Sequence, residues 1–357
     1  MRTALSWLGR TLLFLAVALC FAPTVVPPFL DRVYYDGPPS DHFDGGRFFN
    51  PGPVPPARRI SMFDRWAGSE PQAVWPDEVA VRPTVPPRRV EGGDMVVTWI
   101  GHATVLVQTE GLNILTDPIW SDIASPVAFA GPRRVRQPGV RFEDLPRIDL
   151  VLVSHNHYDH LDLPTLRRLW ERDRPLIVTG LGNDTIMLGR GIEAVARDWG
   201  EHVPVRPGIE VVMARNYHWT SRWLTDRNRA LWSAFAVRTP SGAIFFAGDT
   251  GLGGGAWARE AAAHGPYRLA ILPIGAYAPR AVMRSSHLNP GEALGVFDIL
   301  RPTMALGMHW GTFQLSWEAI DAPPRALAAL SRARGLPPSR FVTTEVGQSF
   351  RVPPLAR

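Results

Sequence analysis

The stretch SHNHYDHLD, residues 154–162, places three histidines and two aspartates within nine positions. The whole chain has only ten histidines in 357 residues, so this concentration indicates a chemical role for the stretch. His155 and His157 alternate and can therefore point to one side of an extended segment. Asp159 and His160 follow where the chain must turn, so they can face a second centre. Imidazole and carboxylate groups together suit zinc or a similar divalent ion, and the stretch therefore predicts metal ligands.

The histidine stretch follows an apolar run that predicts a buried strand. RIDLVLVSH (147–155) is apolar without alternation, which is typical of a strand covered on both faces. LPTLRRLWERD (163–173) has the periodicity of an amphipathic helix, and NPGEALGVFDIL (289–300) begins with a capping asparagine and a proline. Short apolar runs such as GAIFFAGDTG (242–251) end in polar loops. Strands and helices alternate, which predicts the α/β class.

Two metals need more ligands than one segment holds. His218, Asp249 and His309 each end an apolar run, in VVMARNYH, IFFAGD and TMALGMH. Each of them alone could equally cap a loop or pack in the core. Their shared place after a strand makes the set a stronger indication, and Asp249 could bridge two metals through its two oxygens. The predicted ligands are His155, His157, Asp159, His160, His218, Asp249 and His309.

These motifs resemble those of the metallo-β-lactamase superfamily. H-x-H-x-D-H, FAGDTG and GMHWGTF carry the resemblance, which extends over about residues 40 to 320. Within the superfamily the chain resembles the branch of zinc phospholipases D that hydrolyse N-acyl-phosphatidylethanolamine. The supporting stretches are DHFDGGRFFNP, TWIGHATVLVQ, LTDPIWSDIASP, GPRRVRQPGV, IGAYAPR and SSHLNP. The resemblance implies a four-layer αβ/βα sandwich with the metals at one edge, between two β-sheets.

The resemblance also implies how the ligands are shared between two Zn²⁺ ions per chain. One ion would be held by His155, His157 and His218, and the other by Asp159, His160 and His309. Asp249 and a hydroxide would bridge the two ions.

The activity implied is that of a phosphodiesterase of the phospholipase D type, acting on N-acyl-phosphatidylethanolamine or a related phospholipid. Two zinc ions would lower the pKa of a shared water, supply hydroxide as nucleophile and stabilise charge in an in-line displacement. Asp159 and His287 are the candidate catalytic residues, with His287 protonating the leaving alcohol or binding phosphate. His287 and Tyr158 are the candidate substrate-binding residues. Ser286 departs from the family pattern before His287, and His102 in GHAT is either beside the site or a buried structural histidine.

Other functions fit the same ligands. A lactonase, an esterase or another phosphodiesterase could use this scaffold, and a membrane-tethered metal-binding protein without catalysis is the alternative from another class. Nucleic acid is disfavoured because the sequence has no extra domain and no aromatic and basic binding motif. A net charge of +5 favours anionic partners such as phosphate groups and acidic lipid surfaces. A homodimer is left open.

The N-terminal part predicts an extension and a membrane segment. Residues 1–30 are predicted to be an anchor or signal segment, 31–92 a Pro/Gly-rich extension packed on the body, and 93–357 the hydrolase domain. The uncharged run at 11–30 has about the length that crosses a bilayer. The expected location is a body on the outer, periplasmic or extracellular, face of the inner membrane, or secretion after signal cleavage. The single cysteine, Cys20, excludes internal disulfides and thiolate metal sites.

A second membrane contact is predicted beside the ligand His218. WTSRWLTDRNR (219–229) combines two tryptophans with three arginines. Tryptophan favours the membrane interface and arginine favours anionic head groups, so the stretch could seat the site on a bilayer. The alternative is an ordinary loop whose tryptophans pack inward.

Overall fold

The computed structural model describes residues 7–19, 32–52, 71–127 and 129–355. Cys20 and the second half of the predicted membrane segment lie outside this range. Residues 7–19 are helical. No helix in the described ranges combines the length and the apolar character that a membrane crossing requires.

The first sheet is formed around the predicted strand before the histidine stretch. Its strands are Met95–Gly101 (β1), Thr104–Thr109 (β2), Leu112–Thr116 (β3), Leu150–Val153 (β4), Leu176–Gly180 (β5), Val195–Arg197 (β6) and Ser349–Arg351 (β14). They follow the order β14-β1-β2-β3-β4-β5-β6. β3, β4, β5 and β6 are parallel, so their carboxyl ends meet at one edge.

The second sheet carries the other predicted strand ends. Its strands are His202–Arg206 (β7), Ile209–Ala214 (β8), Ala234–Arg238 (β9), Ala243–Phe246 (β10), Tyr267–Pro273 (β11), Met304–Met308 (β12) and Phe341–Val342 (β13). They follow the order β13-β12-β11-β10-β9-β8-β7. β10, β11 and β12 are parallel, which brings the loops after β10 and β12 to the same edge.

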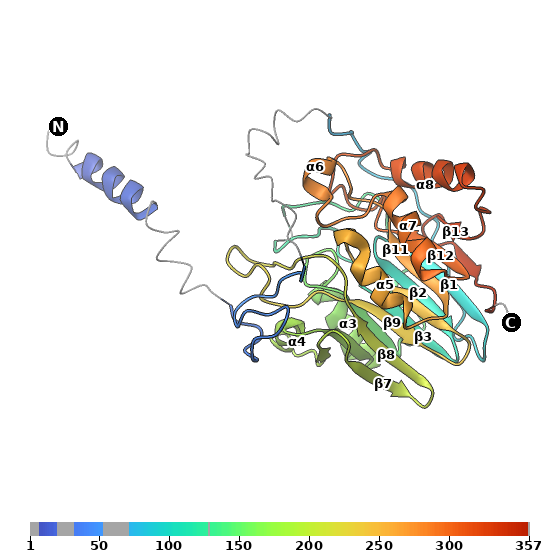
Figure 1. Cartoon of the computed structure of the whole chain (residues 1–357). Coiled ribbons are helices and arrows are strands. Elements are labelled where there is room, and N and C mark those ends of the chain that lie inside the picture. The colour runs from blue at the N-terminus through green and yellow to red at the C-terminus, as the bar shows by residue number, and fades with distance from the viewer. Residues whose placement is uncertain (1–6, 20–31, 53–70, 128, 356–357) are drawn as a thin grey trace.

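Helices cover the outer face of each sheet (Figure 1). The helices are Leu163–Asp173 (α3), Asn183–Leu188 (α4), Ala256–Ala262 (α5), Arg280–Met283 (α6), Pro290–Leu300 (α7) and Ala322–Ala333 (α8), with 3-10 turns at Phe142–Asp144 (η1) and Gly253–Gly255 (η2). α3 and α4 flank the first sheet, while α5 and α7 flank the second, with α8 against α7. Asn289 caps α7 through a capping box, as its sequence predicts.

Side-chain alternation explains the four layers. Along β4, Leu150 and Leu152 join the core between the sheets, while Val151 and Val153 join the core under α3. Successive side chains of a strand point to opposite faces, so an unbroken apolar run covers both. The predicted α/β class and four-layer αβ/βα sandwich are therefore confirmed, and α3 has the bounds predicted from the sequence.

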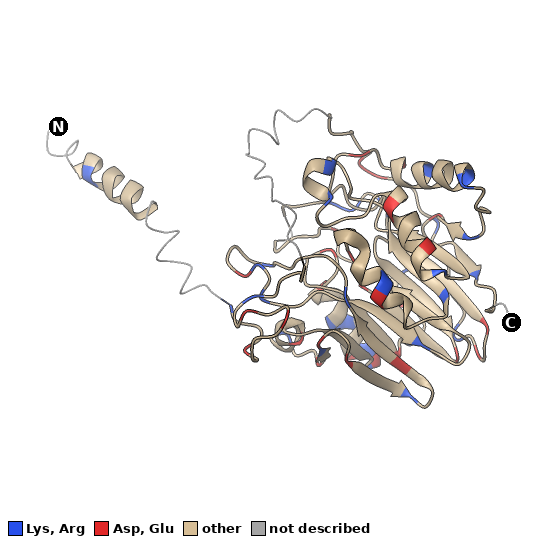
Figure 2. Cartoon of the chain, viewed as in Figure 1, with Lys and Arg blue, Asp and Glu red and all other residues tan. Residues whose placement is uncertain are grey.

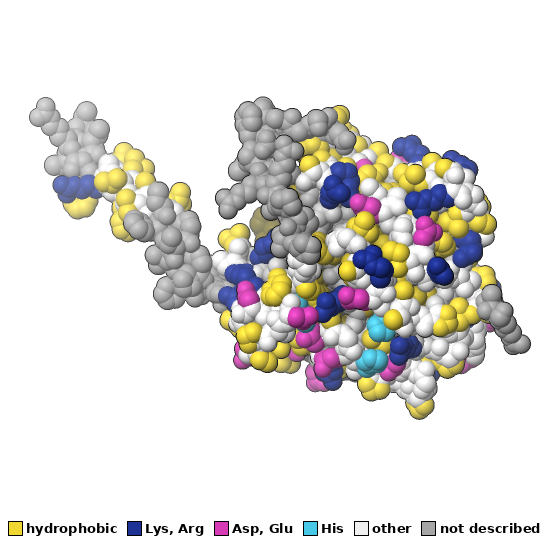
Figure 3. Space-filling view, in the orientation of Figure 1, with side chains coloured by type: hydrophobic (Ala, Val, Ile, Leu, Met, Phe, Trp, Pro, Cys, Tyr) yellow, Lys and Arg dark blue, Asp and Glu magenta, His cyan; other side chains and the backbone are white. Residues whose placement is uncertain are grey.

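The surface charge is dispersed on the face shown. Basic and acidic residues occur on several elements of both sheets and their helices (Figure 2). In the space-filling view, arginines lie scattered among apolar and uncharged side chains (Figure 3). The net charge of +5 thus forms no single basic region on this face.

Candidate metal centre

A first group of imidazoles forms where β4 and β8 end. His155 and His157 follow β4, and His218 lies four residues after β8. The Nε2 of His155 is 2.8 Å from the Nδ1 of His157, which is 3.4 Å from the Nε2 of His218. The three ring nitrogens lie within 4.8 Å of one another. One shared proton cannot satisfy three converging nitrogen lone pairs, whereas one divalent cation can. We name this group, His155, His157 and His218, the three-histidine cluster.

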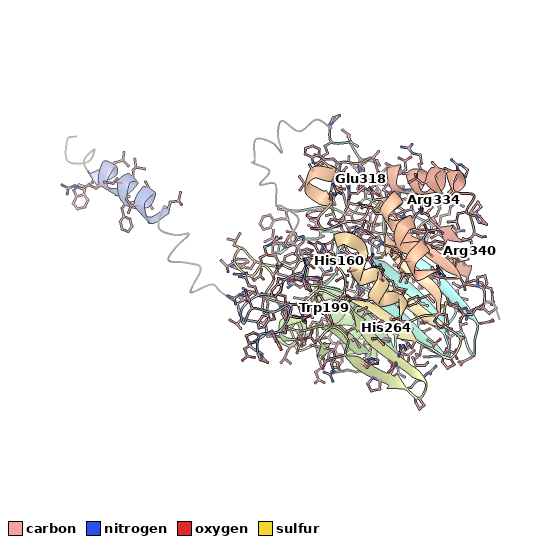
Figure 4. All side chains as sticks on the ribbon, viewed as in Figure 1. His160, Trp199, His264, Glu318, Arg334 and Arg340 are labelled. Carbon is pink, nitrogen blue, oxygen red and sulfur yellow. The ribbon has the colours of Figure 1, made fainter. Side chains whose placement is uncertain are left out.

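A second group lies beside it. The Nε2 of His160 is 3.2 Å from the Nε2 of His309, which directly follows β12. The Oδ2 of Asp159 lies 3.3 Å from the first nitrogen and 3.5 Å from the second. We name Asp159, His160 and His309 the mixed cluster. His160 lies near the middle of the molecule in Figure 4.

Asp249 connects the two clusters. It follows β10, and its Oδ2 lies 3.1 Å from the Nε2 of His309, 3.2 Å from that of His160 and 4.0 Å from that of His218. Its Oδ1 is buried and has no hydrogen-bond partner. A buried carboxylate oxygen without a partner is costly unless a cation compensates it. The fold thus brings all seven predicted ligands together in an arrangement that two cations would fit.

Protonation differs between the clusters. Burial lowers the pKa of His155 and His218 well below the ordinary value and that of His157 to about 4, so these imidazoles are neutral, as metal ligands must be. Burial acts against charge on His309 too, but attraction to Asp249 outweighs it and raises the pKa to about 9. Protons on the mixed cluster therefore balance the carboxylates in the absence of a cation, and metal binding would displace them.

Comparison with known proteins agrees with this geometry. The family model for the beta-lactamase superfamily domain matches residues 112–310, more than half of the chain. The chain belongs to the beta-lactamase superfamily. Its fold and its histidine and aspartate clusters make it a metal-dependent hydrolase of the metallo-β-lactamase type.

Two relatives are named for the hydrolysis of N-acyl-phosphatidylethanolamine. N-acyl-phosphatidylethanolamine-hydrolyzing phospholipase D 1 of Caenorhabditis elegans is 37% identical over 290 residues, which cover 76% of this chain and 82% of the relative. The mitochondrial enzyme of that name from Saccharomyces cerevisiae is 34% identical over 258 residues. That match covers 71% of this chain but only 55% of the yeast protein. The resemblance seen in the sequence motifs is confirmed.

Two solved structures share the fold. An isothiocyanate hydrolase from Delia radicum gut bacteria superimposes with a TM-score of 0.59 at 18% identity, covering 72% of this chain and 98% of the other. Igni18, a metallo hydrolase from Ignicoccus hospitalis, gives 0.55 at 21% identity over 73% of this chain and 99% of its own. At these identities the likeness concerns the fold alone.

Residues outside the predicted set orient the ligands of this superfamily member. Asp117, which follows β3, accepts hydrogen bonds from the Nδ1 of His160 at 2.6 Å and the Oγ of Ser154 at 2.5 Å. The first bond leaves the Nε2 of His160 free to face the mixed cluster. His218 donates from Nδ1 to the carbonyl of Ser286 at 3.0 Å. The sequence signal for Asp117 was its position at a strand end in LTDP, like that of Asp249 in FAGD.

His102 lies at the site. It is buried, and its Nε2 is 2.9 Å from the Oδ2 of Asp159. Its ring nitrogen can also reach the mixed cluster, because the four ligand atoms lie within 4.8 Å of one another. Of the two alternatives left by the sequence, the structure favours a position beside the site.

His287 lies next to the seven predicted ligands. Its Nδ1 is 3.7 Å from the Oδ2 of Asp249 and has no hydrogen-bond partner. Burial lowers its pKa to about 4. With Asp249 and His309 it forms a further group of ligand atoms within 4.8 Å, so the geometry admits a metal contact as well as a substrate contact.

Tyr158 faces a different space. Its hydroxyl donates to the carbonyl of Arg222 at 2.9 Å, and the guanidinium carbon of Arg222 lies 3.9 Å from the ring centre. The ring lines a cleft of about 980 Å³ whose lining includes none of the seven predicted ligands. The structure therefore does not bring Tyr158 together with His287.

The arginines of the stretch 219–229 are engaged within the protein. Arg222 donates to the carbonyls of Asn156 and Leu161, and Arg229 donates to the carbonyl of Gly46. Arg227 stacks on Trp219 with its guanidinium carbon 4.0 Å from the ring centre. The exposed tip is apolar instead, because Leu224 is 89% exposed. The sequence predicted that these arginines would contact lipid head groups. In the structure they contact backbone carbonyls and an indole ring of the same protein instead.

Proposed function

We propose that the protein is a zinc-dependent phosphodiesterase of the phospholipase D type that hydrolyses N-acyl-phosphatidylethanolamine or a related phospholipid. The observation that carries the proposal is the Asp249 carboxylate within reach of both clusters. The 37% identity to the Caenorhabditis elegans enzyme supports the phospholipid substrate. The donor set is compatible with zinc, because zinc binds imidazole nitrogens and carboxylate oxygens.

The chain's own residues would supply a pair of adjacent cation sites. When bound, two divalent ions supply Lewis-acid stabilisation of phosphoryl charge and a water of lowered pKa. Asp117 holds the imidazole of His160 with Nε2 directed at the mixed cluster. His102, through its Nε2, holds the carboxylate of Asp159 in position at the mixed cluster. Such outer hydrogen bonds set the tautomer and the orientation of metal ligands.

His287 is suited to bind a phosphoryl oxygen. With its pKa lowered to about 4 by burial, the imidazole is neutral at pH 7 and can donate one hydrogen bond. A neutral imidazole is a weak acid, so this favours phosphate binding over protonation of the leaving alcohol. Its backbone is held in place by the guanidinium of Arg280, which donates to the carbonyl of His287 at 2.9 Å and pairs with Glu292.

The decisive test compares substrates and metal content on one sample. The full chain is assayed against N-acyl-phosphatidylethanolamine, a simple aryl phosphodiester and a lactone, and its metals are quantified. We expect water to cleave the phosphodiester to phosphatidic acid and N-acylethanolamine. Asp249→Asn should lose nearly all activity, while Asp298→Asn, a change at an exposed carboxylate on α7, should keep it. Hydrolysis of the lactone alone would favour a lactonase and refute the phospholipase assignment.

We also propose that the body works against a membrane surface. Leu224 and Phe129 are 89% and 86% exposed, and their loops both contribute residues to the 980 Å³ cleft. Exposed apolar tips beside arginine-containing walls suit an interface with anionic lipid. Leu224→Asp and Phe129→Asp should weaken binding to phosphatidylglycerol vesicles, whereas Leu330→Asp, on α8, should not. Equal binding by all three variants would remove the case for this surface.

A further inference from the structure

Residues 40–50 lie outside the part of the chain that matches the family model, yet they contact the loop that carries a predicted metal ligand. Asn50 donates from Nδ2 to the backbone carbonyl of His218 at 2.8 Å. Its Oδ1 accepts from the indole nitrogen of Trp232 at 3.2 Å. A carbonyl only accepts and an indole only donates, so these two partners determine the orientation of the amide.

The same segment holds the rest of that loop. Phe48 donates its backbone N–H to the carbonyl of Asn228 at 2.8 Å. Arg229 donates to the carbonyl of Gly46 at 2.8 Å, and Arg47 donates to the carbonyl of Thr225 at 3.0 Å. The loop from 215 to 233 contains no helix or strand, so these bonds replace the ladder that a regular element would have.

The segment is itself firmly attached to the body. Phe43 and Phe48 are buried in one apolar cluster with Leu231 and Trp232. The buried ring of His42 is bonded on both nitrogens and stacks on Trp199 with ring centres 4.4 Å apart. Figure 4 places Trp199 on the side of the molecule where this N-terminal segment packs. Because the segment is fixed to the body, its hydrogen bond from Asn50 can hold the backbone of His218 in one position.

We propose that Asn50 is a positioning residue for the metal ligand His218. Residues 40–50 thereby help to form the three-histidine cluster by positioning the loop that carries this ligand. Three residues separate His218 from the end of β8, which leaves its backbone to be placed by other contacts. The amide of Asn50 places the backbone, and the bond from His218 to Ser286 orients the ring. The inference rests on metal binding at the proposed clusters and does not depend on the phospholipid substrate.

The test variant is Asn50→Asp in the full chain. A carboxylate keeps the size and can still accept from Trp232, but it cannot donate to the carbonyl of His218. The carboxylate oxygen and the carbonyl oxygen would then face each other as two acceptors with no hydrogen between them, so we expect metal affinity at the three-histidine cluster to fall about 10–100-fold, as for other outer-shell partners of ligands. Zinc titration against a competing chelator measures this. The affinity should fall at the same cluster as in His218→Ala, and not at the cluster that His309→Ala weakens.

Two further measurements separate positioning from general stability. Asn113→Asp is the control, because Asn113 is a buried asparagine that also donates to backbone carbonyls but serves neither cluster. Both of its metal affinities should equal those of the wild type. In the metal-free protein, Asn50→Asp should raise amide hydrogen exchange in 218–229 without changing exchange in β4.

The outcomes are distinct. Unchanged zinc affinities in Asn50→Asp, or equal losses at both clusters accompanied by faster exchange in β4, would overturn the inference. If the wild type binds two ions but cleaves no phospholipid, the proposed function fails while the role of Asn50 stands.

Discussion

Replacing Asp117 by asparagine should disable one metal cluster through a change of imidazole tautomer. The Oδ1 of Asp117 accepts from the backbone N–H of Ser154 at 2.7 Å, and its Oδ2 accepts from the hydroxyl of Ser154 and the Nδ1 of His160. A carboxylate accepts from all three donors, whereas an amide presents one oxygen and one NH₂ group. Whichever way the amide sits, an N–H group faces a donor.

The structure indicates how large the effect should be. If the amide oxygen keeps the bond from the backbone of Ser154, the NH₂ group faces the Nδ1 of His160. The imidazole then relieves the conflict by moving its proton to Nε2, the nitrogen 3.2 Å from the Nε2 of His309. A protonated nitrogen cannot bind a metal, and restoring the competent tautomer leaves a buried donor unsatisfied, at about 1–3 kcal/mol. This agrees with the roughly 10–100-fold loss of affinity typical of such partners.

Zinc titration of Asp117→Asn, with unfolding measured in parallel, tests this reasoning. We expect weaker binding at the mixed cluster and a smaller loss at the three-histidine cluster, whose His155 reaches Asp117 through the hydroxyl of Ser154. Asp173→Asn is the matched control, because Asp173 is a buried carboxylate that accepts the backbone N–H of Ile148 at 2.8 Å away from both clusters. The Asp173→Asn variant should have a lower free energy of unfolding and wild-type metal affinity at both clusters. Wild-type affinity at both clusters in Asp117→Asn would refute the tautomer argument.

Three further predictions concern other parts of the protein. Chelation of divalent ions should lower the thermal midpoint by several degrees and zinc should restore it, since ligand at 100 times its Kd stabilises by about 2.7 kcal/mol; calorimetry that shows no shift would contradict a metal-loaded site. His287→Ala should retain both ions by metal analysis while turnover falls, and loss of an ion would make His287 a ligand. Burial opposes a charge on His42, but hydrogen bonds to Asp198 and Asp41 outweigh it and raise its pKa. Its stabilising effect is therefore complete below about pH 6.5 and is lost as pH rises through the folded-state pKa, so the urea stability gap between wild type and His42→Gln should shrink from pH 6 to pH 9.

The sequence determined the α/β class and the residue types of the metal centre. H-x-H-x-D-H directly follows a short apolar run without alternation, which specifies a buried strand, and the polar residues after it specify the loop at its end. His218, Asp249 and His309 could be named for the same reason, since each follows a local apolar pattern. Within each sheet, parallel strands then brought the loops after β4, β10 and β12 to one edge.

Only the tertiary structure decided which side chains support these ligands. The bond from Asn50 to His218 joins residues 168 positions apart, and the bond from His160 to Asp117 joins residues 43 apart. The sequence around Arg222 predicted an exposed cation, but its guanidinium instead satisfies backbone carbonyls from the histidine stretch. Local patterns encode strand, helix and burial through nearest neighbours along the chain, whereas the partner of a polar group depends on which distant segments the packed core brings within 3 Å.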